Sequence, residues 1–271
     1  MEGSVRIDAP AETADGAGET PAMAKTGTLY GVGMGPGDPD FLTVKAMRVL
    51  EHAPVLVHFC KRGKRGNART IADAVVCDPV REFPLAYPYT TELHPDHPEY
   101  VSALAGFYDE AAGRLADHLG AGRDVAILSE GDPFFYGSFM HLWRRLKDRF
   151  PVEVIPGVTG MSGCWTRAGT PITWGDDVLT ILPATLPREA LVERLKGTDA
   201  AVIMKLGRHL PKVRGVLAET GFLARAVYVE RGTMAGEQVV PLAEKADDVA
   251  PYFSMVLVPG EEGARERAGK G

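Results

Sequence analysis

The sequence has few of the features that mark secreted, membrane-spanning or nucleic-acid-binding proteins. Its 271 residues contain only three cysteines, Cys60, Cys77 and Cys164, with no Cys-x-x-Cys pair. We therefore expect reduced, buried thiols in a cytoplasmic protein rather than a disulfide framework. No apolar run approaches the ~20 residues that a membrane-spanning helix needs, and a net charge of −6 argues against a nucleic-acid binder. We expect no membrane and no nucleic-acid partner.

Both ends of the chain also lack apolar patterning. Residues 1–26 have no apolar core and carry more acidic than basic residues, which predicts a disordered tail rather than a signal peptide. Residues 261–271 predict a flexible tail. The whole chain is 45% hydrophobic and 24% charged, an ordinary globular composition. Its length allows one large or two medium domains, each with a core of its own.

Between the tails, short β-rich runs alternate with longer amphipathic ones. The run TLYGVGM predicts a strand that leads into a Gly/Pro loop, and the next segment predicts a helix with Thr43 as its N-cap. Repetition of this pattern over 27–148 predicts a largely parallel sheet flanked by helices. Five further strand-like runs, beginning with VEVI after Phe150, predict a second domain over 149–260. The expected fold is α/β, with two α/β domains that meet along a cleft.

A glycine-rich loop, GVGMGPGDP at 31–39, follows the first predicted strand. A dinucleotide-binding loop would need a third glycine where this chain has Pro36 or Asp38, and an acidic residue where the second strand runs into Lys61 and Arg62. Its prolines also leave few free N–H groups for a phosphate. An NADP-dependent oxidoreductase therefore stays only a distant alternative.

Two more loops follow predicted strands: SEGDPFFYGSF at 129–139 and IPGVTGMSG at 155–163. Asp132 precedes a proline, so we expect it to be extended. Its carboxylate would lie at the carboxyl end of a parallel strand, where α/β sheets bind ligands. We interpret Phe134, Phe135 and Tyr136 mostly as packing residues.

Taken together, these three loops resemble the tetrapyrrole methylase family, which uses S-adenosylmethionine (SAM), and the resemblance covers about residues 27–260. The segments FCKRGKRGNARTIA and LAYPYTTELHPDHPEY resemble the precorrin-2 C20-methyltransferase branch. The resemblance implies two α/β domains with SAM in the interdomain cleft, and a homodimer. It also implies methylation of C20 of precorrin-2, giving precorrin-3A and S-adenosylhomocysteine in cobalamin biosynthesis. The same reaction on cobalt-factor II and a non-catalytic tetrapyrrole carrier remain open alternatives.

The resemblance also assigns site residues. Those expected to bind SAM are Pro36, Glu130, Gly131, Asp132, Phe135, Thr159, Gly160, Leu206 and Gly232. Leu206 and Gly232 correspond to positions that contact adenine through backbone and apolar surface. Thr159 and Gly160 correspond to the loop that faces the carboxylate end of SAM.

The densest basic run in this acidic chain is Lys61, Arg62, Lys64, Arg65 and Arg69. Precorrin-2 bears eight carboxylates, and arginine suits bidentate carboxylate contacts. We therefore hypothesise that Lys61, Arg62 and Arg65, together with Asp38 in the first loop, bind the substrate. A solvated charged loop is the alternative.

No Ser-His-Asp or Cys-His constellation is visible, which suits transfer of a methyl group to an electron-rich, enamine-like carbon that needs mainly positioning. Tyr136, Glu130 and water are the candidate proton acceptors, and no catalytic residue is assigned. His94 and His97 are separated by prolines, so we expect a surface loop rather than a metal site.

Overall fold

The computed structural model describes residues 25–76, 81–89 and 98–262. Most of the two predicted tails, Cys77, His94 and His97 lie outside these residues. Within them, no helix is long and apolar enough to cross a membrane.

The first sheet has five strands, and every pair in it is parallel. Its order is β3-β2-β4-β1-β5, from β1 (Leu29–Gly33), β2 (Val55–Lys61), β3 (Arg81–Tyr87), β4 (Val125–Ser129) and β5 (Val152–Ile155). This confirms the predicted parallel sheet. Because all five strands run the same way, the loops that follow them gather at one edge.

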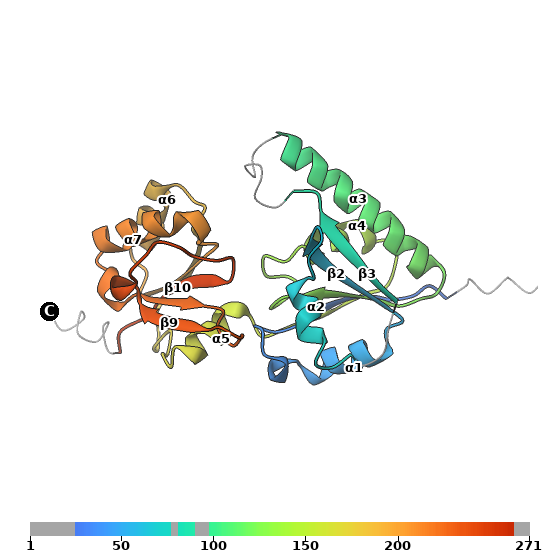
Figure 1. The fold of residues 1–271 in the computed structure, drawn as a ribbon, viewed down its shortest axis with the longest axis horizontal. Helices are drawn as coiled ribbons and strands as arrows, with labels where there is room; N and C mark the ends of the chain where they lie inside the picture. Colours follow the sequence, from blue (N-terminus) through green and yellow to red (C-terminus); the bar gives the residue numbers. More distant parts are fainter. Residues whose placement is uncertain (1–24, 77–80, 90–97, 263–271) are drawn as a thin grey trace, which may run out of the picture.

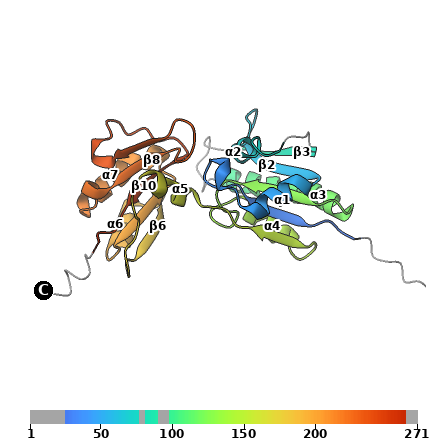
Figure 2. The ribbon, with the colours of Figure 1, turned by 90° about the horizontal axis from the view of Figure 1, so that it is seen from below.

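Helices cover both faces of this sheet, so its strands are apolar on both sides. They are α1 (Val44–His52), α2 (Asn67–Ala72), α3 (Pro98–Gly120) and α4 (Phe139–Leu146). Val55 and Val57 pack into the core with α3 and α4, whereas Leu56 packs into the core with α1 and α2. Thr43 caps α1 as predicted, because its Oγ1 accepts a hydrogen bond from the Ala46 N–H at 3.1 Å. Figures 1 and 2 show these layers from two directions.

Strand β5 is where the predicted organisation fails. The series of short strand-like runs after Phe150 predicts that VEVI belongs to the second domain. In the structure, however, Val152 and Ile155 pair with Leu29 and Val32 of β1. The first sheet therefore continues past residue 149. Sheet membership depends on a partner more than a hundred residues away, which the local pattern does not encode.

The second sheet is mixed. Its order is β6-β7-β10-β8-β9, from β6 (Leu179–Pro183), β7 (Ala200–Met204), β8 (Val227–Glu230), β9 (Gln238–Pro241) and β10 (Ser254–Val258). Only the β6–β7 pair is parallel. Helices α6 (Arg188–Leu195) and α7 (Leu210–Glu219) pack on one face, and α5 (Gly160–Arg167) packs on the other. Figure 1 shows α5 between the two sheets.

Four single turns of 3-10 helix complete the described chain. They are η1 (Pro39–Phe41), η2 (Gly207–His209), η3 (Leu223–Arg225) and η4 (Leu242–Glu244). The first two follow β1 and β7, so they lie next to the loops in which the candidate site residues are found.

Candidate active site at the domain junction

The three glycine-rich loops lie against one another, because they follow the adjacent strands β4, β1 and β5. The Gly131 N–H donates to the Gly35 carbonyl at 2.8 Å. A Cβ on Gly33 would lie 2.4 Å from the Gly157 nitrogen, and one on Gly157 would lie 2.1 Å from the Gly131 oxygen. Only glycine allows this approach. The glycines of the first loop therefore serve loop-to-loop packing, which argues against the dinucleotide alternative.

Asp132 joins two of these loops through its carboxylate. One oxygen accepts a hydrogen bond from the Phe134 N–H at 2.8 Å, and the other accepts one from the Gly157 N–H at 3.2 Å. The carboxylate thus holds the loop after β4 against the loop after β5. Within the first of these loops, the ring of Phe135 lies edge-on to that of Tyr136, with centroids 5.0 Å apart.

The first loop also contacts the C-terminal domain. A Cβ on Gly163 of α5 would lie 2.5 Å from the Pro36 Cβ, and the Asp38 N–H donates to the Thr233 Oγ1 at 3.3 Å. The Asp38 carboxylate accepts a hydrogen bond from the Asp40 N–H at 3.0 Å, and so begins the η1 turn. We call the region where these segments meet the domain junction. It consists of residues 33–38, 129–136 and 156–163 in the three loops, and of residues 204–207 and 231–234 at the ends of β7 and β8.

Helix α5 begins inside the domain junction. The Thr159 Oγ1 accepts a hydrogen bond from the Ser162 N–H at 3.4 Å and caps the helix. Beside Gly160, the nearest atom to a built Cβ is the Met255 Cε at 3.9 Å, so the helix start is open. Free N–H groups and the helix dipole at such an end favour a carboxylate or another anion. The helix was not predicted, because the glycine-rich run GMSG at its start indicates a loop.

Leu206 does not offer the apolar surface predicted for it. Its side chain is fully buried in the core beneath α7, so that part of the prediction is wrong. The residues on either side of it, Lys205 and Gly207, have left-handed backbone conformations, with φ of 58° and 42°. Gly232 packs on α5, where a Cβ would lie 2.7 Å from the Cys164 sulfur.

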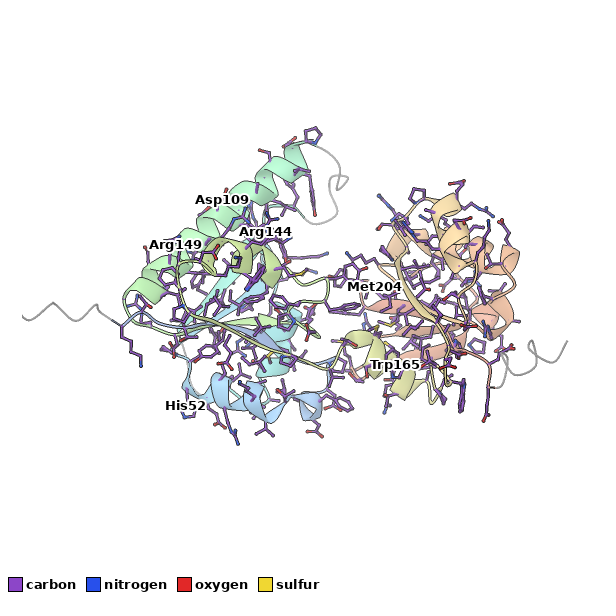
Figure 3. The ribbon with its side chains drawn as sticks, turned by 180° about the vertical axis from the view of Figure 1, so that it is seen from behind. His52, Asp109, Arg144, Arg149, Trp165 and Met204 are labelled. Carbon is purple, nitrogen blue, oxygen red and sulfur yellow. The ribbon has the colours of Figure 1, made fainter. Side chains whose placement is uncertain are left out.

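Tyr136 and Lys205 meet across the domain junction. The Lys205 Nζ lies 4.6 Å from the centroid of the Tyr136 ring, and burial lowers the pKa of Lys205. Met204, directly before it, lies on the side of the C-terminal domain that faces the N-terminal domain (Figure 3). Tyr136 has φ of 55°, and its side chain is 47% exposed. Tyr136 is therefore only in part a packing residue, since its ring contacts Phe135 but stays half exposed. Left-handed backbone in two non-glycine residues, Tyr136 and Lys205, is typical of functional sites.

Glu130, in the loop after β4, is influenced by the start of α2. Burial raises the pKa of its carboxyl above the usual value, and the Asn67 side chain and the Ala68 backbone at the start of α2 oppose this. The sequence held no sign of this influence.

The cations of the basic run differ in whether they form ion pairs with acidic residues. Arg65 and Arg69 form ion pairs with Asp73, and Arg69 is buried where it also binds Glu82. Arg69 is therefore a structural residue rather than part of a free basic rim. Lys61, Arg62 and Lys64 are exposed and have no acidic partner among the residues that the structure describes.

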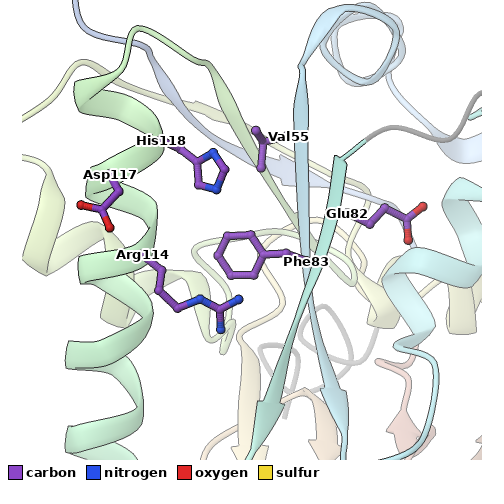
Figure 4. Close-up of a pocket in the computed structure, with 6 residues that line it drawn as sticks. All are labelled: Val55, Glu82, Phe83, Arg114, Asp117 and His118. Carbon is purple, nitrogen blue, oxygen red and sulfur yellow. The ribbon is translucent and has the colours of Figure 1, made fainter.

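A cavity elsewhere does not fit a catalytic site. About 310 Å³ in volume, it lies between β3 and the second half of α3, lined by Val55, Glu82, Phe83, Arg114, Asp117 and His118 (Figure 4). Val55 begins β2, so the cavity lies away from the carboxyl ends of the strands. Two of its lining residues contact each other, because the Arg114 guanidinium lies 4.1 Å from the Phe83 ring centroid. Within the described ranges, no cluster of three or more His, Cys, Asp or Glu side chains could hold a metal ion.

Comparisons with known proteins agree with this geometry. Residues 28–246 match the family described as Tetrapyrrole (Corrin/Porphyrin) Methylases. The chain is 57% identical over 234 residues to precorrin-2 C(20)-methyltransferase from Sinorhizobium sp, covering 86% of this chain and 96% of that protein. It is 28% identical to cobalt-precorrin-2 C(20)-methyltransferase from Salmonella typhimurium, covering 86% and 96%.

A solved structure shares the fold. It is uroporphyrin-III C-methyltransferase from Thermus thermophilus complexed with S-adenosylhomocysteine, with a TM-score of 0.59 and 24% identity, covering 85% of this chain and 92% of that one. The two α/β sheets, the three joined loops and the match over most of the chain lead to one conclusion. The chain belongs to the tetrapyrrole (corrin/porphyrin) methylases.

Proposed function

We propose that this protein transfers a methyl group from SAM to C20 of precorrin-2, giving precorrin-3A and S-adenosylhomocysteine in cobalamin biosynthesis. The observation that carries the proposal is 57% identity to a precorrin-2 C(20)-methyltransferase across 96% of that enzyme. The joined loops of the domain junction supply a site at which the reaction can occur.

The residues of the domain junction fit SAM in two respects. The start of α5 at Thr159 and Gly160 is open and carries N–H groups that suit a carboxylate. A Cβ on Gly207 would meet nothing within 4 Å, so the backbone beside Leu206 leaves room for a flat ring. SAM supplies an electrophilic methyl group on sulfur when bound. Of the other predicted contacts, Pro36, Gly131, Asp132 and Phe135 would shape the walls of the site, and Gly232 would hold α5 in place.

The protein would act mainly by orientation. An enamine-like carbon is already nucleophilic, so holding the two reactants in line supplies most of what the reaction needs. Lys61 and Arg62 are free to meet substrate carboxylates, whereas Arg65 would first have to leave Asp73. Asp38 already begins the η1 turn, so we expect it to shape the first loop rather than bind an anionic substrate.

The closest alternative is the same methylation on a cobalt-loaded ring. Identity to the cobalt-precorrin-2 C(20)-methyltransferase is 28%, against 57% to the precorrin-2 C(20)-methyltransferase, which favours precorrin-2. The test is turnover of both substrates under anaerobic conditions, with precorrin-3A identified by mass. A kcat/KM higher for the cobalt-loaded ring would overturn the assignment of substrate. Calorimetry with S-adenosylhomocysteine and NADPH tests the cofactor, and binding of NADPH alone would overturn the methyltransferase proposal.

We further propose a homodimer in the cytoplasm, on the family resemblance. Light scattering coupled to size-exclusion chromatography measures the mass directly. A mass of one chain at micromolar concentration would contradict the dimer.

A further inference from the structure

We propose that Lys205 is a substrate-binding residue, and that its ammonium group, held over the ring of Tyr136 at the domain junction, binds a carboxylate of the tetrapyrrole. The inference deepens the proposed function, on which it rests for the identity of the substrate. It adds a cation from the C-terminal domain to the basic run of the N-terminal domain, at a position that the sequence did not single out.

The first line of support is the place of Lys205 in the fold. It directly follows β7, whose last residue, Met204, pairs with Met255 of β10. Strand β10 lies against the start of α5, because the Met255 Cε is the atom nearest to a Cβ built on Gly160, at 3.9 Å. The Lys205 Nζ lies 4.6 Å from the ring centroid of Tyr136, which belongs to the loop after β4. The ammonium group is therefore among segments of both domains and beside the expected SAM contacts.

The second line of support is the backbone that holds the two side chains. Lys205 and Tyr136 have φ of 58° and 55°, which residues with a side chain rarely adopt. Beside Lys205, the Met204 carbonyl accepts a hydrogen bond from the Ala184 N–H at 2.7 Å, and the Leu206 side chain is fully buried. The fold thus fixes two unfavourable conformations that bring an ammonium group and an aromatic ring together. Such conformations are concentrated at ligand-binding and active sites.

The third line of support is the lack of a counter-charge. Within the described ranges, three lysines lie over aromatic rings. Lys147 also forms an ion pair with Asp148. Lys245 likewise forms an ion pair with Asp247. Lys205 forms none with any residue that the structure describes, although burial disfavours its charged form and lowers its pKa. An anionic group of a ligand would compensate this cation.

Two kinds of carboxylate come to the domain junction under the proposed function, that of SAM and those of the tetrapyrrole. The open start of α5, at Thr159 and Gly160, already offers N–H groups to the first. The second kind suits the contact with Tyr136, because the tetrapyrrole also brings a large apolar face that can cover a side chain that is 47% exposed. Lys205 is therefore assigned to the tetrapyrrole.

The experiment compares Lys205→Met, which keeps the apolar stem without the charge, with Lys205→Arg, which keeps the charge. Lys147→Met is the matched control, because it removes a lysine that lies over an aromatic ring at the end of α4, outside the domain junction. We expect the KM for precorrin-2 to rise about tenfold in Lys205→Met, as loss of a charged hydrogen bond would cause. The kcat and the Kd for S-adenosylhomocysteine should stay within about twofold. Lys205→Arg should recover most of the affinity, and Lys147→Met should behave as the wild type.

The dependence on salt gives a readout that a merely structural role would not change. Ion pairs between a protein and a charged ligand are screened by salt, so the KM of the wild type should rise with ionic strength. In Lys205→Met it should rise less steeply, because one such pair is absent. Lys147→Met should keep the slope of the wild type.

Three results would overturn the proposal. An unchanged KM in Lys205→Met, with the salt dependence of the wild type, would make Lys205 only a contact between domains. An increase in the Kd for S-adenosylhomocysteine as large as that in the KM would make it a ligand of the SAM carboxylate. A fall in kcat at constant KM in both Lys205→Met and Lys205→Arg, with a changed pH profile, would make it an acid or base.

A binding measurement without methyl transfer separates this proposal from the proposed function. Uroporphyrin III is a metal-free tetrapyrrole with carboxylate side chains, and its fluorescence reports binding. We expect its Kd to be about tenfold higher for Lys205→Met than for the wild type or Lys147→Met. An equal Kd in all three proteins would overturn the role of Lys205. A wild type that shows the expected difference but does not methylate precorrin-2 would overturn only the proposed function.

Discussion

At the scale of single residues, Asp132 joins two loops of the domain junction through its carboxylate. It follows β4, yet it accepts a hydrogen bond from the Gly157 N–H beyond β5. The sequence indicated a functional aspartate at this position from its place at a strand end. That its carboxylate bonds to backbone N–H groups of two loops emerged only from the structure.

We predict that Asp132→Ala lowers the free energy of unfolding by about 1–3 kcal/mol, because the partly buried Gly157 N–H and the exposed Phe134 N–H lose their acceptor. It should also weaken S-adenosylhomocysteine binding, since the loops would no longer be held together. Denaturant unfolding and calorimetry measure the two effects. Unchanged stability together with lost binding would instead indicate a direct ligand contact.

His58 predicts a dependence of stability on pH. It is buried on β2, with no hydrogen-bond partner for its Nδ1 among the described residues. Burial lowers its pKa below the usual 6.5; Glu82 opposes this, and Arg69 and Arg65 add to it. The unfolded chain therefore binds a proton more readily than the folded one, so stability present above pH 6.5 is lost as the pH falls through the folded pKa. The melting temperature should fall less between pH 7 and pH 5 in His58→Leu than in the wild type; equal falls would contradict this.

At the scale of elements, α5 is the helix that links the two sheets. It begins beyond β5 of the first sheet and packs on the second. Its Gly163 lets Pro36 of the first loop lie against the helix. The glycine is thus needed for contact between domains rather than for the helix itself.

Gly163→Ala tests this contact. The new Cβ would lie 2.5 Å from the Pro36 Cβ, and we expect a loss of about 1–3 kcal/mol of stability from overpacking, with reduced methyl transfer. Gly113→Ala in α3 is the matched control. A Cβ there meets nothing within 4 Å, so it should stabilise the protein by up to about 1 kcal/mol through helix propensity. A similar change in both variants would contradict the assigned role of Gly163.

The elements also show what could be predicted from the sequence. Thr43 gave a correct helix start, because a helix cap is local. Strand β3, with Pro84 inside it, and the glycine-rich α5 were missed, because tertiary contacts override their weak propensities. The three loops were found by their resemblance to known motifs, whereas the contact of Lys205 with Tyr136 joins two domains and has no local signature.

At the scale of the whole molecule, the candidate site belongs to both domains. The three loops come from the parallel sheet, and residues 204–207 come from the mixed one. A ligand bound there should therefore restrain segments in both. We predict that S-adenosylhomocysteine slows amide hydrogen exchange in 129–136, 156–163 and 204–207, with little change in α3. Slowing confined to one domain would contradict a shared site.

Among the residues that the structure describes, four non-glycine residues have left-handed backbones, and all of them lie at the domain junction: Tyr136, Lys205, Arg231 and Thr233. Glycine or asparagine would adopt these conformations at lower cost. A laboratory selection for heat resistance alone should therefore replace these four residues early, and the resulting enzymes should last longer at high temperature while turning over more slowly. The domain junction would then be the part of the chain in which evolution has favoured catalytic turnover over thermal stability.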